Sequence, residues 1–441
     1  MGGAAGMKRG TWRDLLLATL CIMAITLSAA GVAASGITVV SEFGIHTEAW
    51  KTRVAAFTEE TAITVNVIQY PYANYLDQLT LNFTGGRPNF DVAYISGLWY
   101  PSFATAGYIT PLDQLFDDPA DLADIPGLDL ARQRDHIWIA PYMNEIGGIA
   151  YRRDLFEDPV EKARFQERYG YELRPPQTLR EYRDVAEFFH RPPDLYGVTL
   201  MGRRSIFLAT HFMNRLWARG GTILDEELRP AFDGPDGVAA LEETKAMFQF
   251  ANPAARNYDF QEALTEFEGG RSAMAELWTT GLLYADDPSV STVVGKASFA
   301  RFPQDASAVG QRLPALYIFW GFAVSSASPK KDAAFKFVEF MTRADQQALA
   351  APGRNIPSRL SALDSPRLRS LHPWLAPFQD VLRNVVPTPL VPLIPEGNII
   401  MNEYLVPEIS AYIAGEKPAK QALDDAAGRV ERLLRENGYY D

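Results

Sequence analysis

The chain has 441 residues, of which 47% are hydrophobic and 22% are charged, and its formal net charge is −12 at pH 7. This length predicts two domains. The acidic balance disfavours binding to nucleic acids or to anionic membranes, because both partners are themselves negatively charged.

The first 34 residues have the pattern of a secretory signal peptide. A basic stretch at 8–13 precedes a short apolar run at 15–27, and small side chains before and at Ala34 predict cleavage after that residue. Polar residues interrupt the run, whereas a transmembrane anchor needs about 20 unbroken apolar residues. We therefore expect a leader of residues 1–34 and an exported chain that resides in the periplasm.

Cys21 is the single cysteine and lies inside the apolar run. The preceding Leu20 is larger than the small residue that a lipid-attachment motif requires, so we expect Cys21 to be removed with the leader. The exported chain then contains no disulfide and no cysteine-based metal site. It is also more acidic than the full sequence, because the leader carries three basic residues and only one acidic residue.

Strands and helices alternate after the leader. Apolar runs predict strands at 37–40, 63–68 and 90–95, with amphipathic helices between them, and a strand–helix–strand order predicts parallel pairing. Further on, Thr178 and Glu181 form a capping box before a helix that Pro192-Pro193 ends. The other predicted elements are a strand at 196–201, helices at 205–219 and 236–250, a hairpin at 222–232, a strand ending at Leu277-Trp278 and an amphipathic C-terminal helix.

The segment 316–349 reads LYIFWGFAVSSASPKKDAAFKFVEFMTRADQQAL. Its apolar start predicts a buried strand, and Ser328 and Pro329 suit the cap and first position of the next helix. Ala334, Phe337, Val338 and Met341 would form one face of that helix. The segment resembles the W-G-x-A-[VI]-x-x-x-[SA]-x-x-K-x-x-A-x-x-F pattern of extracellular solute-binding proteins, the capture subunits of ABC importers, and in particular their carbohydrate-binding, maltose-binding-protein-like branch.

Two other segments carry the same resemblance. IAPYMNEIGGIAYRRDLF, at 139–156, is similar to the family's first crossing between lobes, with Arg152 in place of the usual Asn. FEGGRSAM, at 267–274, is similar to the family's F-x-x-G-x-x-A-M turn. The resemblance implies an α/β two-lobe periplasmic-binding-protein fold of type II-like topology, with a mixed, mostly parallel sheet flanked by helices in each lobe. It places residues 35–141 plus 299–345 in the N-terminal lobe and 142–298 plus 346–441 in the C-terminal lobe, with the ligand cleft between them.

Candidate ligand-binding residues follow from strand ends and from the resemblance. Side chains just past predicted strands are Glu42, Phe43, Ser96, Trp99, Tyr100 and Arg203. The resemblance adds Tyr142, Asn144, Trp278, Trp320, Gly321, Arg354, Asn355 and Tyr404, with Trp278 as the ring expected to stack on a sugar. Structural alternatives remain open: Glu42 and Thr47 as a helix cap, the aromatic rings as core, and Arg203 as a solvated charge.

Motifs for covalent chemistry are missing from the sequence. The five histidines lack HExxH spacing, and there is no Walker loop, GxGxxG or GxSxG motif. Glu145 and Glu276 are the carboxylates considered for a glycosidase pair. We expect no enzyme, no cofactor and no metal, but a monomeric protein that captures a mono- or oligosaccharide or polyol by lobe closure and delivers it to an ABC permease. The alternatives are a polyamine, a polyol phosphate or an organic anion as the ligand, or a secreted polysaccharide-active enzyme.

Overall fold

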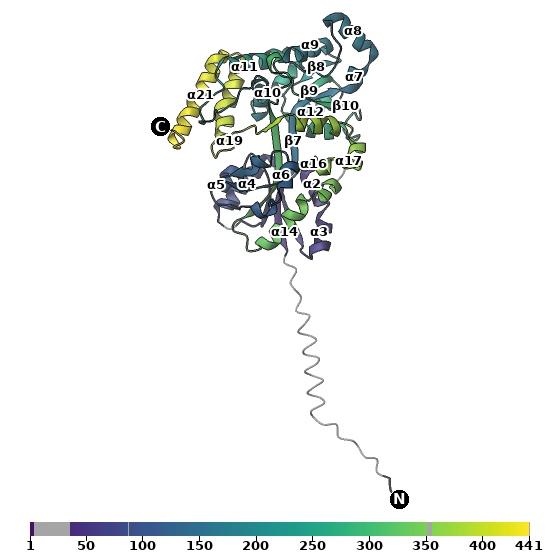
Figure 1. The fold of residues 1–441 in the computed structure, drawn as a ribbon, viewed down its shortest axis with the longest axis vertical. Helices are drawn as coiled ribbons and strands as arrows, with labels where there is room; N and C mark the ends of the chain where they lie inside the picture. The colour runs from purple at the N-terminus through teal and green to yellow at the C-terminus, as the bar shows by residue number, and fades with distance from the viewer. Residues whose placement is uncertain (4–35, 87, 351–354, 441) are drawn as a thin grey trace.

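A computed structural model describes residues 1–3, 36–86, 88–350 and 355–440 of the chain. It contains two lobes, one built around α2–α6 and α14 and the other around α7–α13, α20 and α21, with strand β7 running from one to the other (Figure 1). The predicted signal peptide lies outside the described residues, apart from its first three.

One continuous sheet passes through both lobes, with its strands in the order β2-β1-β3-β11-β7-β9-β8, and β4, β10 and β12 pair beside this path. The strands are β1 (Ile37–Glu42), β2 (Val65–Tyr70), β3 (Val92–Ser96), β4 (Ile109–Thr110), β7 (Ala140–Arg152), β8 (Tyr196–Thr199), β9 (Ser272–Trp278), β10 (Ala297–Arg301), β11 (Pro314–Ser325) and β12 (Val386–Thr388). A separate ribbon joins β5 (Arg132–Gln133) to β6 (His136–Ile137).

The N-terminal lobe begins with the predicted parallel strands. β1 pairs in parallel with β2 and with β3, so the parallel pairing predicted from the strand–helix–strand order is confirmed. Trp50, Phe337 and Phe322 pack edge to face in the core, with centroids of Trp50 and Phe337 6.1 Å apart. The helices of this lobe are α2 (Ile45–Lys51), α3 (Val54–Thr61), α4 (Tyr72–Thr84), α5 (Tyr100–Thr105), α6 (Pro119–Asp124), α14 (Lys331–Thr342), α15 (Ala344–Leu349) and α16 (Leu360–Leu363).

Helix α14 starts later than its sequence predicts. The helix begins at Lys331, and Ser328 does not cap it. The Ser328 hydroxyl instead donates to Asp91 at 2.7 Å and accepts from the Lys330 amide at 3.0 Å. The predicted apolar face is confirmed, because Ala334, Phe337, Val338 and Met341 are all buried.

Strands β7 and β11 connect the lobes. The first half of β7 pairs with β11, and its second half, from Gly147, pairs with β9 and β10. Both glycines at the changeover are sterically required: a Cβ on Gly147 would lie 2.7 Å from Leu316 Cβ, and one on Gly148 would lie 2.5 Å from the Ala300 carbonyl oxygen. The predicted return of the chain at residue 299 is wrong, since β10 still pairs with the C-terminal-lobe half of β7 and the return occurs along β11.

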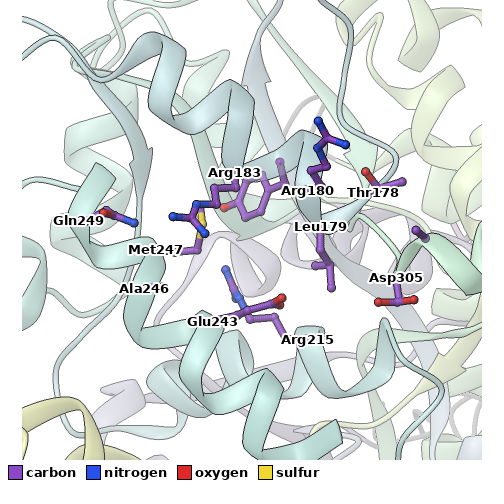
Figure 2. A pocket seen from close by; sticks show the side chains of 12 residues that line it. Thr178, Leu179, Arg180, Arg183, Arg215, Glu243, Ala246, Met247, Gln249 and Asp305 are labelled. Atoms are coloured by element: carbon purple, nitrogen blue, oxygen red, sulfur yellow. The ribbon is translucent and has the colours of Figure 1, made fainter. Parts of the chain in front are cut away.

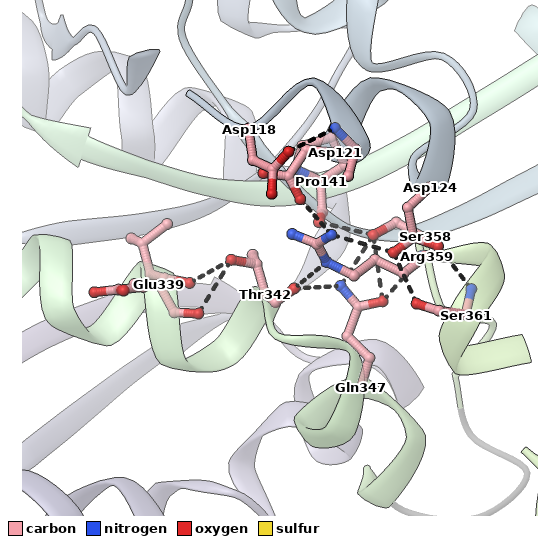
Figure 3. A network of polar contacts seen from close by, with 12 residues as sticks. Asp118, Asp121, Asp124, Pro141, Glu339, Thr342, Gln347, Ser358, Arg359 and Ser361 are labelled. Carbon is pink, nitrogen blue, oxygen red and sulfur yellow. Dashed lines mark hydrogen bonds and ion pairs between the residues drawn. The ribbon is translucent and has the colours of Figure 1, made fainter. Parts of the chain in front are cut away.

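The third passage between the lobes is held by a polar network around Arg359 (Figure 3). Arg359 donates to the Thr342 carbonyl at 2.7 Å and to the carboxylates of Asp121 and Asp124. Ser358 donates to the Pro141 carbonyl at 2.8 Å and accepts from Gln347 at 3.0 Å. The predicted boundary at 346 is therefore too early, because the chain is still bound to α6 and α14 of the N-terminal lobe at Arg359.

The C-terminal lobe forms around β8 and β9, which pair in parallel, and the antiparallel half of β7. The predicted capping box is confirmed at the start of α9, where Thr178 accepts from the Glu181 amide at 3.0 Å. The predicted hairpin at 222–232 is present as a short antiparallel turn, in which the Ala231 amide donates to the Ile223 carbonyl at 3.0 Å and Leu224 forms an isolated bridge with Pro230. The helices are α7 (Arg153–Glu157), α8 (Pro159–Tyr169), α9 (Leu179–Phe189), α10 (Ile206–Trp217), α11 (Pro235–Met247), α12 (Phe260–Glu268), α13 (Thr280–Ala285), α17 (Pro366–Leu371), α18 (Leu375–Arg383), α19 (Gly397–Ile399), α20 (Val406–Ala414) and α21 (Ala419–Glu436).

Candidate functional site

Aromatic side chains gather where β3 of the N-terminal lobe ends, opposite the middle of β11. Tyr72, at the start of α4, lies 6.2 Å from Trp320 and 6.3 Å from Trp99, centroid to centroid. Trp99 and Trp320 are themselves 5.2 Å apart and nearly buried, whereas Tyr72 is 57% exposed. The two tryptophans thus support Tyr72, which presents a ring to solvent.

Glu145 connects the two lobes through its side chain. It projects from the middle of β7, is 4% exposed, and lies with Oε1 3.2 Å from His46 Nε2 of α2. The same oxygen accepts a hydrogen bond from the hydroxyl of Thr280, in the first turn of α13 in the other lobe. A change in the relative position of α2 and α13 would therefore alter the contacts of this carboxylate.

Glu42 is the last residue of β1 and is 3% exposed. Thr47 donates to its Oε2 at 3.0 Å, but Glu42 does not cap the backbone of α2, so the cap expected for this pair is replaced by a side-chain contact. Burial raises the pKa of Glu42, and the nearby His46 partly offsets that rise. Phe43, the next residue, is exposed.

The C-terminal lobe contributes a second aromatic group. Phe260 stacks in parallel on Trp278 with centroids 4.6 Å apart and an interplanar angle of 7°, and Phe207 lies 5.2 Å from Trp278. Trp278 is only 8% exposed, whereas Phe207 and Phe260 are half-buried. The stacking role expected for Trp278 needs correction, because Phe260 already covers one face of its ring.

The aromatic groups of the two lobes face a common junction. Surrounding protein raises the pKa of Tyr72, and the carboxylates of Glu145, Glu42 and Asp259 add to the rise, in that order. Asp259 caps α12 immediately before Phe260, so one of the charges that raise the pKa of Tyr72 belongs to the other lobe. We use the name lobe junction for the region bounded by Glu42, His46, Tyr72, Glu145, Asp259 and Phe260.

Several predicted residues serve the fold in this structure. Tyr100 is buried and donates to the carbonyls of Leu130 and Arg132, and Tyr142 is buried against Tyr94 and Phe322. Neither ring can contact a ligand without rearrangement, and the expectation for both is corrected.

Gly321 was expected to let a ligand approach the backbone, but the structure shows another reason for glycine at this position. A Cβ there would lie 2.1 Å from the Ala140 carbonyl oxygen, at the irregularity between Trp320 and Gly321 in the pairing of β11 with β7. The residue therefore permits two strands to approach each other. The buried Ser96 hydroxyl accepts from the Leu98 amide at 3.2 Å, and the Asn144 amide group reaches the Ser358 carbonyl at 3.5 Å.

The remaining predicted residues are Arg203, Asn355, Tyr404 and Arg354. Arg203 donates to Glu262 at 2.7 Å and to Asp259 at 3.4 Å, so its charge is already neutralised. Asn355 is buried, and neither atom of its amide group has a hydrogen-bond partner. Tyr404 is half-buried in the π-helical turn Ile400–Leu405. Arg354 lies outside the described residues.

A cavity of about 300 Å³ lies elsewhere, within the C-terminal lobe (Figure 2). It is lined by side chains of α9 and α11 together with Arg215 and Asp305. None of the predicted ligand-binding residues lines it, so this cavity is separate from the lobe junction.

Glu276 is fully engaged beneath that cavity and is not free for acid–base chemistry. Arg215 binds both of its oxygens, His211 lies 2.7 Å from Oε2, and Tyr182 donates to Oε1 at 2.8 Å. Burial alone would raise the pKa of Glu276, but Arg215 and His211 outweigh it and lower the pKa. His211 also serves the fold, because its Nε2 accepts a hydrogen bond from the Met201 amide at 2.8 Å while Nδ1 faces Glu276.

The sequence model of the family described as bacterial extracellular solute-binding protein matches residues 44–348. The chain belongs to this family. Within the described ranges, no helix is long and apolar enough to cross a membrane, and no three metal-ligating side chains gather into one group.

Individual relatives are similar over most of their length. The chain is 24% identical over 405 residues to a probable amino-acid ABC transporter periplasmic-binding protein of Sinorhizobium fredii, covering 90% of this chain and 88% of that protein. It is 24% identical over 373 residues to the mannitol-binding protein of Pseudomonas aeruginosa, covering 78% and 80%. A solute-binding protein of Agrobacterium radiobacter K84 in complex with ribitol shares the fold with a TM-score of 0.75 and 25% identity, covering 90% and 98%.

Sequence reasoning missed several residues of the lobe junction. Tyr72 follows the end of β2, Thr280 follows β9, and His46 follows β1, so the strand-end rule applied to every strand would have found all three. Phe260 was missed because α12 was not predicted. The signal for that helix was present, since Asp259 and Glu262 form a capping box.

Proposed function

We propose that the chain captures a sugar or sugar alcohol at the lobe junction and delivers it to an ABC permease. The observation that carries the proposal is a pair of solvent-accessible aromatic rings, Tyr72 and Phe260, one on each lobe, together with the buried carboxylates of Glu42 and Glu145, of which Glu145 contacts both lobes. Aromatic faces cover the C–H surface of a sugar, and carboxylates accept hydrogen bonds from its hydroxyls. The mannitol-binding and ribitol-bound relatives support a small polyol.

Lobe closure supplies the mechanism. A ligand shifts the protein toward a closed state only to the extent that it binds that state better than the open one. Contacts with Tyr72 on one lobe and Phe260 on the other are available together only when the lobes approach. Glu145 contacts His46 of one lobe and Thr280 of the other, so its contacts would change when the lobes close.

The proposal also covers the location of the chain, its oligomeric state and its protein partner. The leader of residues 1–34 would direct the chain to the periplasm, where it would act as a monomer without a cofactor and without nucleic acid. The permease would bind the face that the two lobes form together on closing. An enzymatic role has weaker support, because the carboxylate of Glu276 is fully occupied by Arg215, His211 and Tyr182.

A thermal-shift panel tests the proposal. Alditols, mono- and oligosaccharides, uronic acids, polyamines and polyol phosphates are each added to the purified chain. A ligand at 100 times its dissociation constant stabilises the protein by about 2.7 kcal/mol, and we expect this for at least one neutral sugar or alditol. Stabilisation only by organic anions, or conversion of the ligand detected by NMR, would contradict the proposal.

A further inference from the structure

Two buried carboxylates of the lobe junction have unused hydrogen-bonding capacity. The described contacts of Glu42 engage only Oε2, through Thr47, and those of Glu145 engage only Oε1, through His46 and Thr280. An ionised carboxylate has roughly four acceptor positions. Both side chains therefore offer acceptors at a place that is almost inaccessible to bulk water.

A third group points to the same place. Tyr94, in β3, is completely buried, and its hydroxyl has no hydrogen-bond partner. Glu42 and Glu145 contact adjacent residues of α2, since Thr47 donates to Glu42 at 3.0 Å and His46 lies 3.2 Å from Glu145. Burial raises the pKa of Tyr94, and the charges of both carboxylates add to the rise. An unpaired buried polar group costs about 1–3 kcal/mol.

Positive charge is scarce at this point. Among the described residues, the basic side chain in contact with Glu145 is His46, and no lysine or arginine forms an ion pair with Glu42 or Glu145. Arg203, across the junction, is already shared between Asp259 and Glu262. No lysine or arginine therefore neutralises these two buried carboxyl groups, and a cation bound next to them would favour their ionised forms.

We infer that the captured solute carries a protonated amino group, which lies between Glu42 and Glu145, next to hydroxyl-bearing carbons that pack on Tyr72. The inference rests on the proposed function and narrows its substrate class to amino sugars and amino alditols. An ammonium group has three donors and no acceptor, which matches a site made of carboxylate oxygens. Charge-assisted hydrogen bonds are also about twice as strong as neutral ones, and the rings of Tyr72 and Trp320 favour a nearby cation.

Matched pairs of small molecules test the inference by isothermal titration calorimetry. The pairs are 1-amino-1-deoxysorbitol with sorbitol, and glucosamine with glucose, with N-acetylglucosamine as the uncharged amine derivative. We expect at least one amine to bind ten times or more tightly than its hydroxyl partner at pH 7. We also expect Glu42→Gln and Glu145→Gln each to reduce that ratio toward one, whereas Glu59→Gln, on the exposed face of α3, leaves it unchanged.

The outcomes separate the inference from the proposed function. Equal binding of amine and hydroxyl partners by the unaltered chain would overturn the inference and leave polyol capture standing. Binding of no amine and no hydroxyl probe would contradict both. If a glutamine variant fails to fold, judged by its circular dichroism, the ratio measured on the unaltered chain still decides.

Discussion

Phe260 lies parallel to Trp278, with ring centroids 4.6 Å apart, and so covers one face of the tryptophan ring. Phe260 is the more accessible member of the pair, and the nearly buried Trp278 packs against it.

We expect Phe260→Ala and Trp278→Ala to act differently. Phe260→Ala should lower ligand affinity about tenfold or less, because aromatic stacking contributes about 0.5–1.5 kcal/mol beyond burial, and it should leave stability nearly unchanged. Trp278→Ala should lower the free energy of unfolding by about 3–5 kcal/mol, as for other buried large rings. Urea unfolding and calorimetric titration measure the two effects. The reverse assignment of effects would mean that Trp278 is the ring that contacts the ligand.

The buried pair of Arg215 and Glu276 should be essential for stability. Removing one partner leaves an uncompensated charge, which costs about 3–5 kcal/mol, so Arg215→Met should be strongly destabilising in urea unfolding. Lys420→Met is the control, because its pair with Asp424 is exposed to solvent, and an exposed ion pair contributes little to stability. Similar losses from the two changes would show that the Arg215 pair contributes no more than a surface pair.

Glu268 should make stability depend on pH near neutrality. Burial, assisted by Asp287, raises its pKa from 4.5 to about 7. The folded state then prefers the protonated acid, so the free energy of unfolding should fall as pH rises from about 4.5 to about 7 and stay level above that. One pKa unit corresponds to about 1.4 kcal/mol, and we expect a fall of about 1–3 kcal/mol.

The Glu268 step is isolated by comparing the original chain with Glu268→Gln in urea at several pH values. The difference in the free energy of unfolding between the two proteins should change with pH between 4.5 and 7. It should be independent of pH above 7. Exposed Glu59→Gln serves as the control and should follow the original chain throughout. A pH profile that Glu268→Gln leaves unaltered would contradict the assignment.

Two glycine-to-alanine changes should have opposite signs. Gly321→Ala places a Cβ 2.1 Å from the Ala140 carbonyl oxygen, and the forced separation of β7 and β11 should cost more than about 2 kcal/mol. Gly428→Ala, inside α21, meets no atom nearer than 3.7 Å and should stabilise the chain by about 0.5–1 kcal/mol. Thermal unfolding of both variants compares them directly, and a tolerated Gly321→Ala would mean that the strand irregularity adjusts at little cost.

The sequence predicted well those features that neighbouring residues determine. The capping box of Thr178 and Glu181, the apolar face of α14 and the parallel pairing of β1 with β2 each depend on a short stretch of chain. These patterns are visible because helix and strand periodicities repeat over a few residues.

Features that depend on distant parts of the chain were harder to predict. Nothing near Trp278 indicates that Phe260 covers it, and nothing near Gly321 indicates that Ala140 approaches it. The boundary at residue 299 failed for the same reason, because only the pairing of β10 with β7 shows which lobe that strand joins. Glu42 was placed near the junction because it stands at a strand end, where topology alone brings side chains together, and Trp320 was placed there by the family resemblance.

The central position of β11 has a consequence for when the protein can fold. Ser96 of β3 pairs with Trp320, so the N-terminal lobe lacks an interior strand until most of the chain has been synthesised. Sheets built from such non-local pairs fold slowly, because the cost of closing a long loop precedes the gain from pairing. The sheet of the N-terminal lobe therefore stays incomplete until β11, at residues 314–325 of 441, has been synthesised.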